Sequence, residues 1–106
     1  MSNGSSVDME KARREQIRWI ALDALNHGRP YEVAEPLILG AIQGVPVQCT
    51  ALDLRRELAY LQERGLIEIK HLEGAPWTAE LTRAGVDVVE YTIAVEPGIA
   101  RPKKYW

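Results

Sequence analysis

The chain has 106 residues, 46 % of them apolar and 26 % charged, with a formal net charge of −2 at neutral pH. This length suits a single domain, because a second unit would be too small to bury a core of its own. No apolar run approaches the roughly 18 residues of a membrane helix, and the polar start differs from a signal peptide. Cys49 is the only cysteine, which excludes an internal disulfide and favours a reducing, cytoplasmic setting.

The first helical pattern is expected over residues 8–26, after a flexible arm formed by residues 1–7. Gly28 favours a left-handed helix stop, and Pro30 prevents continuation. One face of this helix carries an apolar stripe at three- and four-residue spacing, which is typical of a surface that packs on a core. The stripe comprises Ile17, Ile20, Ala21, Ala24 and Leu25.

Two large apolar residues of the same helix, Trp19 and Leu22, fall off this stripe. At about 100° per residue, both are expected to point away from the domain's own core. Side chains of this size need a cover, and the same region of a second subunit would supply one. We therefore expect a homodimer with Trp19 and Leu22 in its interface. The alternative cover is the chain's own tail, through Ile99, Tyr105 and Trp106.

The second and third helices follow after a break. Residues 32–44 form a shorter pattern with Pro36 in its first turn, a position that suits proline. Thr50 then opens the clearest helix, because its hydroxyl can cap free amides while Asp53 answers in a capping box. Gly65 ends this helix. Its buried seam comprises Leu54, Leu58 and Leu61.

Residues 66–72 change to an alternating pattern, with Ile67 and Ile69 on one face, which predicts a half-buried strand. A turn at residues 73–76 leads into a second strand, so a hairpin is expected over about Leu66 to Leu81. Thr82 then caps a last helix that ends near Tyr91. Residues 92–106 show no periodicity and read as an extended tail. The matching face of the second strand comprises Trp77, Ala79 and Leu81.

Three helices, a hairpin and a short helix in this order predict an α+β fold of the winged helix-turn-helix class over residues 8–91. The passage Leu58-x-x-Leu61-x-x-x-Gly65-Leu66-Ile67 resembles the step from recognition helix to wing in many bacterial regulators. Leu81-Thr82-x-x-Gly85 resembles the step from the wing to the following helix.

A narrower resemblance rests on two segments. They are Trp77-Thr78-Ala79-Glu80-Leu81-Thr82-Arg83-x-Gly85-Val86-Asp87-Val88 and Pro97-Gly98-Ile99-x-Arg101-Pro102. Together they look like a family of small winged-helix proteins encoded by Mu-like phages and prophages. The resemblance implies a phage context among late or morphogenetic genes, in the cytoplasm of a bacterial host, and implies no activity.

A DNA-binding winged helix places its third helix in the major groove, while the wing contacts the DNA backbone. Here Thr50 could reach a backbone oxygen, and Arg55 and Arg56 could reach guanine edges or phosphates. Tyr60 could contact a phosphate or a thymine methyl group. The remaining candidates for phosphate contacts are Arg64, Lys70, Arg101, Lys103 and Lys104.

The charge pattern leaves a second interpretation open. Asp53, Glu57 and Glu63 balance the arginines of the third helix, and the turn at residues 73–76 has a carboxylate but no cation. DNA-binding domains usually carry a basic surplus or face. We expect a phage-encoded protein that binds double-stranded DNA, in transcriptional regulation or phage DNA processing. The alternative is an adaptor or scaffold that binds a phage or host protein and no DNA.

The sequence does not predict catalysis. His27 lies at a helix end, His71 shares the parity of Ile67 and Ile69, and Cys49 is expected to pack beside the third helix. Metal sites need three or four convergent ligands at short spacing, and no glycine-rich phosphate loop or nucleophile–base pair is visible. We therefore expect no enzymatic activity, metal, cofactor or small-molecule substrate.

Overall fold

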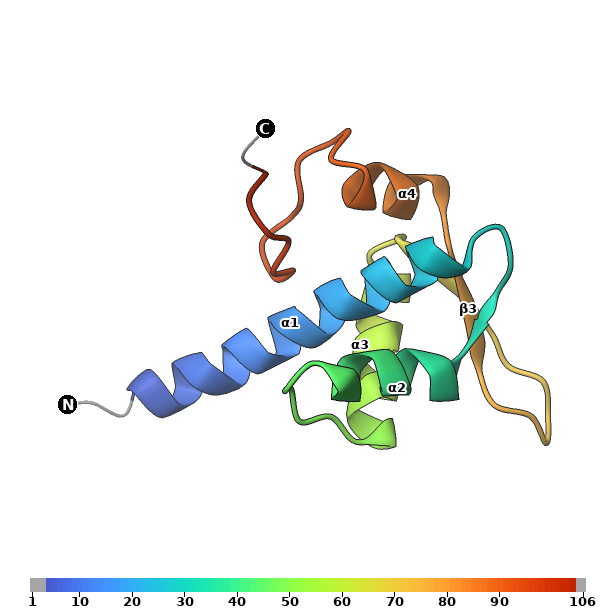
Figure 1. Cartoon of the computed structure of the whole chain (residues 1–106), viewed down its shortest axis with the longest axis horizontal. Coiled ribbons are helices and arrows are strands. Elements are labelled where there is room, and N and C mark those ends of the chain that lie inside the picture. The colour runs from blue at the N-terminus through green and yellow to red at the C-terminus, as the bar shows by residue number, and fades with distance from the viewer. Residues whose placement is uncertain (1–3, 105–106) are drawn as a thin grey trace.

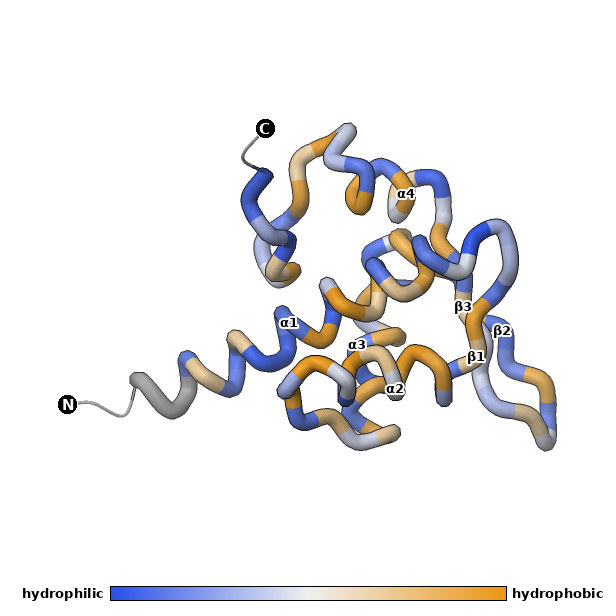
Figure 2. The backbone as a smooth tube through the Cα atoms, viewed as in Figure 1, coloured by the Kyte–Doolittle hydropathy of each residue, from blue (hydrophilic) through white to orange (hydrophobic). Residues whose placement is uncertain are grey.

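Helix α1 (Gly4–Gly28) runs through the middle of the molecule, with α2 and α3 on one side of it and α4 and the C-terminal segment on the other (Figure 1). The computed structural model describes residues 4–104, with side chains from Asp8 onward. The helix begins at Gly4 rather than at Asp8, so part of the expected arm is helical. Residues 1–3 lie outside the described part of the chain. The N-terminal half of α1 extends beyond the other elements and is largely hydrophilic (Figure 2).

The other elements surround α1 in the predicted order, with one addition. Within residues 4–104, four helices accompany a three-stranded antiparallel sheet with the strand order β1-β3-β2. The elements after α1 are β1 (Val33–Ala34), α2 (Glu35–Gly44), α3 (Ala51–Glu63), β2 (Ile67–Lys70), β3 (Thr78–Leu81) and α4 (Arg83–Val89).

Hydrogen bonds from side chains fix the starts of α3 and α4, as the sequence predicts. Thr50 Oγ1 accepts a hydrogen bond from the Asp53 amide at 3.0 Å, and the Thr50 amide donates to Asp53 Oδ2 at 3.0 Å. Thr82 Oγ1 accepts from the Gly85 amide at 3.1 Å. Gly65 follows α3 with a φ of 78°, the left-handed conformation that suits glycine. The predicted caps and the predicted stop of α3 are confirmed.

The predicted hairpin is confirmed, with Ile67 opposite Leu81 and Ile69 opposite Ala79. Strand β1 was not predicted. It pairs Val33 with Ala79 on the other edge of β3. A strand of two residues is too short to produce an alternating pattern, and the notion that residues 32–44 are all helical is corrected at its start.

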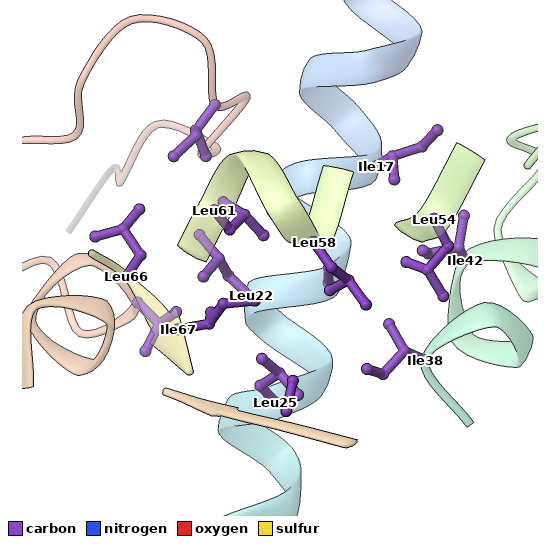
Figure 3. Close-up of a cluster of buried hydrophobic side chains, with 14 of the residues drawn as sticks. Ile17, Leu22, Leu25, Ile38, Ile42, Leu54, Leu58, Leu61, Leu66 and Ile67 are labelled. Carbon is purple, nitrogen blue, oxygen red and sulfur yellow. The ribbon is translucent and has the colours of Figure 1, made fainter. Parts of the chain in front are cut away.

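The prediction that Leu22 points away from the core is wrong. Leu22 is fully buried, and Figure 3 shows it among side chains of α3 and β2, close to Leu58, Leu61 and Ile67. The physical reason is the central position of α1, which packs against α2, α3, β1, β3 and α4 at the same time. A helix with neighbours on several sides buries a wider arc than one stripe.

The stripe itself is confirmed only in part. Ile17, Ala21 and Leu25 are buried, whereas Ile20 and Ala24 are half-buried. Trp19 is also half-buried and meets the ring of Tyr91 edge-on, with 6.4 Å between the ring centroids. Within this chain, Tyr91, which follows α4, therefore supplies part of the cover for Trp19 that a second subunit was expected to give.

We predict that Gly85→Ala lowers the free energy of unfolding by at least about 2 kcal/mol, because a Cβ at Gly85 would lie 2.1 Å from the Leu66 carbonyl oxygen and overpacking is costly. Gly40→Ala is the matched control. A Cβ at Gly40 meets nothing within 4 Å, so alanine should raise the free energy of unfolding by about 0.5–1 kcal/mol through helix propensity. Urea unfolding measures both, and equal effects of the two substitutions would contradict this packing.

Candidate nucleic-acid interface

The outward face of α3 mixes apolar and charged groups. Leu52 is 59 % exposed, and Arg56, Ala59 and Glu63 are exposed as well. Arg56 forms no hydrogen bond or ion pair with any residue that the structure describes. Thr50 is exposed at the start of the helix, where its hydroxyl is already used in the capping box. This face therefore offers one cation that is free to meet a ligand.

Arg55 is turned toward other elements of the fold. Its Nε donates to Glu35 Oε2 at 2.8 Å, and its guanidinium lies over the Trp77 ring, 4.6 Å from the centroid. Glu35 also accepts from the Trp77 amide at 3.1 Å. The hydrogen bond from Arg55 is the main reason why the pKa of Glu35 is lowered. Arg55 thus joins α3 to the start of α2 and to the wing instead of facing a groove of DNA.

Tyr60 lies on the side of α3 that faces α1 and the tail. Its ring is stacked between Arg18, at 3.7 Å, and Arg64, at 4.7 Å. The residue is half-buried against the core. A Cβ at Gly98 would lie 2.5 Å from the Tyr60 hydroxyl, and Gly98 has a φ of 106°. The interpretation of Tyr60 as an outward residue is therefore corrected.

The sequence suggested that Glu57 balances the arginines of α3 in solvent, but the side chain is turned inward. It is 6 % exposed and accepts a hydrogen bond from Arg18 Nε at 2.7 Å. Arg18 Nη1 in turn donates to the Gly98 carbonyl at 2.8 Å. Asp53 also has an intrachain partner, since Arg13 Nη1 lies 3.4 Å from its Oδ2. Glu57 and Asp53, which the sequence placed on a solvated face, therefore each contact an arginine of α1.

Arg64 and Lys70 also have acidic partners. Arg64 lies 3.7 Å from Glu96 in the tail. Lys70 pairs with Glu32, and this contact raises the pKa of Lys70 while it lowers the pKa of Glu32. Glu80 lies 3.9 Å from the same ammonium group. The wing is consequently acidic around its cation.

The wing turn adds no cation to this surface. Leu72, next to the turn, is 73 % exposed. Glu68 and Glu73 are exposed too. A wing that approaches DNA meets phosphates, which these carboxylates would repel.

The tail packs back on the domain. Ile99 is 7 % exposed and belongs to the core. Arg101 donates to the carbonyls of Val88 at 3.0 Å and Ile93 at 2.9 Å, so its guanidinium closes the end of α4. Lys104 lies over the Tyr91 ring at 5.1 Å.

Lys103 is the cation of the tail that stays exposed without a partner among the described residues. The expectation that the tail covers part of α1 in the same chain is supported by Ile99. Tyr105 and Trp106, which were expected to share this role, lie outside the described residues. Arg101 is half-buried and held by backbone carbonyls, whereas Lys103 and Lys104 are exposed.

The described part of the chain contains neither a cluster of metal ligands nor a helix that could span a membrane. No group of three or more His, Cys, Asp or Glu side chains lies close enough to hold a metal ion there. Burial raises the pKa of the Cys49 thiol, which is the direction of an unreactive cysteine. Among these residues no helix is long and apolar enough to cross a membrane.

Comparison with known proteins adds no assignment: no family model matches the chain, and no curated protein matches it with significance.

Sequence reasoning missed Arg18, Glu57 and Glu35 as the residues that organise this surface. A signal for the first pair was present, because Glu57 occupies the helical position between Leu54, Leu58 and Leu61 on the buried side of α3. A carboxylate in a leucine seam needs a buried partner. Nothing local in the sequence pointed to Glu35.

We predict that the Glu35 ion pair stabilises the fold at neutral pH and not in acid. Because the pKa of Glu35 is lowered in the folded chain, its contribution is present above the unfolded value of about 4.3 and disappears as the pH falls through the folded value. Glu35→Gln should lower the free energy of unfolding by about 1.5–3 kcal/mol at neutral pH. That deficit should be smaller at about pH 3 than at neutral pH.

Urea unfolding at both pH values measures this deficit. Glu73→Gln is the control, because Glu73 is exposed at the wing turn and should leave stability unchanged at either pH. A deficit for Glu35→Gln that does not change with pH would contradict the assignment.

We predict strong coupling between Arg18 and Glu57, whose side chains are 13 % and 8 % exposed. Glu57→Leu should lower the free energy of unfolding by about 3 kcal/mol, since it leaves a guanidinium buried without its partner. Arg18→Met combined with Glu57→Leu should cost at least about 1 kcal/mol less than the sum of the single changes. A double-mutant cycle in urea tests this, and additivity would show that the pair does not interact.

Proposed function

We propose that the protein is a winged-helix module whose main role is to bind another protein rather than DNA. The order of elements supports the winged-helix assignment: α1, α2 and α3 precede the β2–β3 hairpin, and β1 adds a short strand to its edge. In this arrangement α3 would be the recognition helix and the hairpin the wing.

One observation carries the choice of a protein partner. Most cations that a DNA-binding surface would need form ion pairs within the chain. These pairs are Arg55 with Glu35, Arg64 with Glu96, and Lys70 with Glu32. Arg101 is likewise held by backbone carbonyls. Nonspecific affinity for duplex DNA comes from cations that neutralise phosphates and release counterions. Ion pairs inside the protein would have to be broken for that purpose.

Exposed apolar groups support the same choice. Leu37 on α2, Leu52 on α3 and Leu72 beside the wing turn are 70 %, 59 % and 73 % exposed. Each belongs to an element that would approach DNA in a DNA-binding winged helix. Apolar side chains of this size suit a protein surface better than a phosphate backbone.

DNA binding remains the second candidate because of Arg56. It stands exposed and unpaired on α3, where an arginine could reach a guanine edge. With Lys103 it would supply the cationic contacts of a weak interface.

The resemblance to small proteins of Mu-like phages supports, as part of this proposal, a partner among phage or host proteins. A homodimer remains a proposal as well, but its interface would have to exclude Leu22, which is buried within the chain.

We predict no binding to random duplex DNA at micromolar protein and about 50 mM salt, measured by fluorescence anisotropy. Low salt maximises the phosphate contribution, so this condition favours the DNA hypothesis. Arg56→Ala separates the two functions further. If DNA is bound, this change should weaken binding by about 1–3 kcal/mol. Salt-dependent binding by the wild type, reduced in Arg56→Ala, would overturn the protein-binding proposal.

A further inference from the structure

A groove of about 690 Å³ lies between α1 and α2. Its apolar walls come from both helices, and the residues that define it are Trp19, Ile20 and Ala24 of α1, Leu37 and Ala41 of α2, and Val45 just beyond α2. We call this surface the α1–α2 groove. Ile20 and Ala24 are the members of the expected core stripe that the fold leaves half-exposed.

Pro102 of the tail also lines this groove, and the described residues leave the groove open. Leu37 is 70 % exposed and Val45 is 40 % exposed. The outward side of α2 continues the groove with small residues, since Gly40 and Gly44 share the face of Leu37 and Ala41 at helical spacing. A Cβ at either glycine would meet nothing within 4 Å. Glycine is unfavourable inside a helix, and no contact within the chain requires it at these positions.

Small residues on a helix allow the backbone of another element to approach closely. Helices pack with their axes about 8–10 Å apart, depending on the side chains at the contact. Two helices that flank an open groove therefore fit a third helix laid between them, which is a common mode of peptide recognition. The absence of charge from α2 after Glu35 leaves this side of the groove apolar.

The charges of the groove are acidic. Asp23 and Glu32 belong to its lining, which contains no Lys or Arg. Glu32 pairs with Lys70, and Asp23 Oδ1 lies 3.7 Å from Nδ1 of His27, which also lines the groove. The Asp23 side chain is nevertheless 47 % exposed. A second copy that laid the same groove against this one would bring carboxylates together and offer no cation from its own lining. A ligand with Lys or Arg beside its apolar stripe would complement the groove.

We infer that the α1–α2 groove is the docking site for an amphipathic helix of a partner protein, with an apolar stripe flanked by Lys or Arg. This inference rests on the proposed protein-binding function and names its site and the chemistry of its partner. The apolar stripe packs on Ile20, Leu37 and Ala41, and a basic side chain at its edge meets Asp23.

The test uses a fluorescein-labelled Leu/Lys peptide of about 18 residues, roughly five helical turns, and a Leu/Glu peptide with the same apolar stripe. Anisotropy should show binding of the Leu/Lys peptide to the full chain and at least tenfold weaker binding of the Leu/Glu peptide. Leu37→Glu should weaken Leu/Lys binding at least tenfold. Met9→Glu is the matched control, because Met9 has nearly the same exposure, 73 % against 70 %, and does not belong to the lining of the groove; it should leave binding unchanged.

Asp23→Lys tests the charge directly and should reduce or reverse the preference for the Leu/Lys peptide. Circular dichroism of each variant confirms that the fold is kept. No binding of the Leu/Lys peptide, or equal losses in Leu37→Glu and Met9→Glu, would overturn the groove as docking site. Sedimentation equilibrium tests the other occupant. If the wild type is a dimer and Leu37→Glu dissociates it, a second copy occupies the groove, and the inference is overturned too. The proposed function fails on a different result, which is duplex DNA binding that depends on Arg56.

Discussion

Arg18 joins three parts of the chain that are far apart in the sequence. From the middle of α1 its guanidinium reaches Glu57 on α3 and the carbonyl of Gly98 in the tail, and it covers one face of Tyr60. The charge is desolvated, so each of these contacts is needed to satisfy it. Gly98 must be a glycine for the tail to come this close to Tyr60. The positions of α3 and of the tail relative to α1 therefore depend on one buried cation.

The same use of charge governs the outer surface. Arg55 and Lys70 each pair with an acid from a segment distant in sequence. The positive charge that could attract phosphate therefore holds α3 to the start of α2 and the β2–β3 hairpin to Glu32. An arginine in a hydrogen-bonded pair is released only at the cost of that pair. A domain built in this way has little cationic surface left for DNA, whatever its topology. This physical constraint, more than the net charge of −2, favours a protein partner.

The features that the sequence predicted are the local ones. The capping box of Thr50, the cap of Thr82 and the alternation of Ile67 and Ile69 each depend on residues within a few positions, so the pattern contains the whole interaction. Glu57 and Glu35 could not be assigned in this way, because their partners are separated from them by 39 and 20 residues. A charge census treats both as solvated acids. The sequence thus predicted the helices and strands that carry the candidate site. It did not predict the ion pairs, because their partners meet only in the folded chain.

A single helical stripe predicts that Ile20 is buried and Leu22 exposed, whereas Leu22 is buried and Ile20 is half-exposed. This difference explains why the groove exists. Because α3 and β2 lie on the Leu22 side of α1, the Ile20 side faces the α1–α2 groove. Beyond Leu37, helix α2 presents only Gly40, Ala41 and Gly44 on this face, and these small residues leave Ile20 half-exposed. Larger residues there would fill the space from within the chain and add apolar burial to the fold. The small residues of α2 thus leave apolar surface of the fold uncovered at the α1–α2 groove among the described residues.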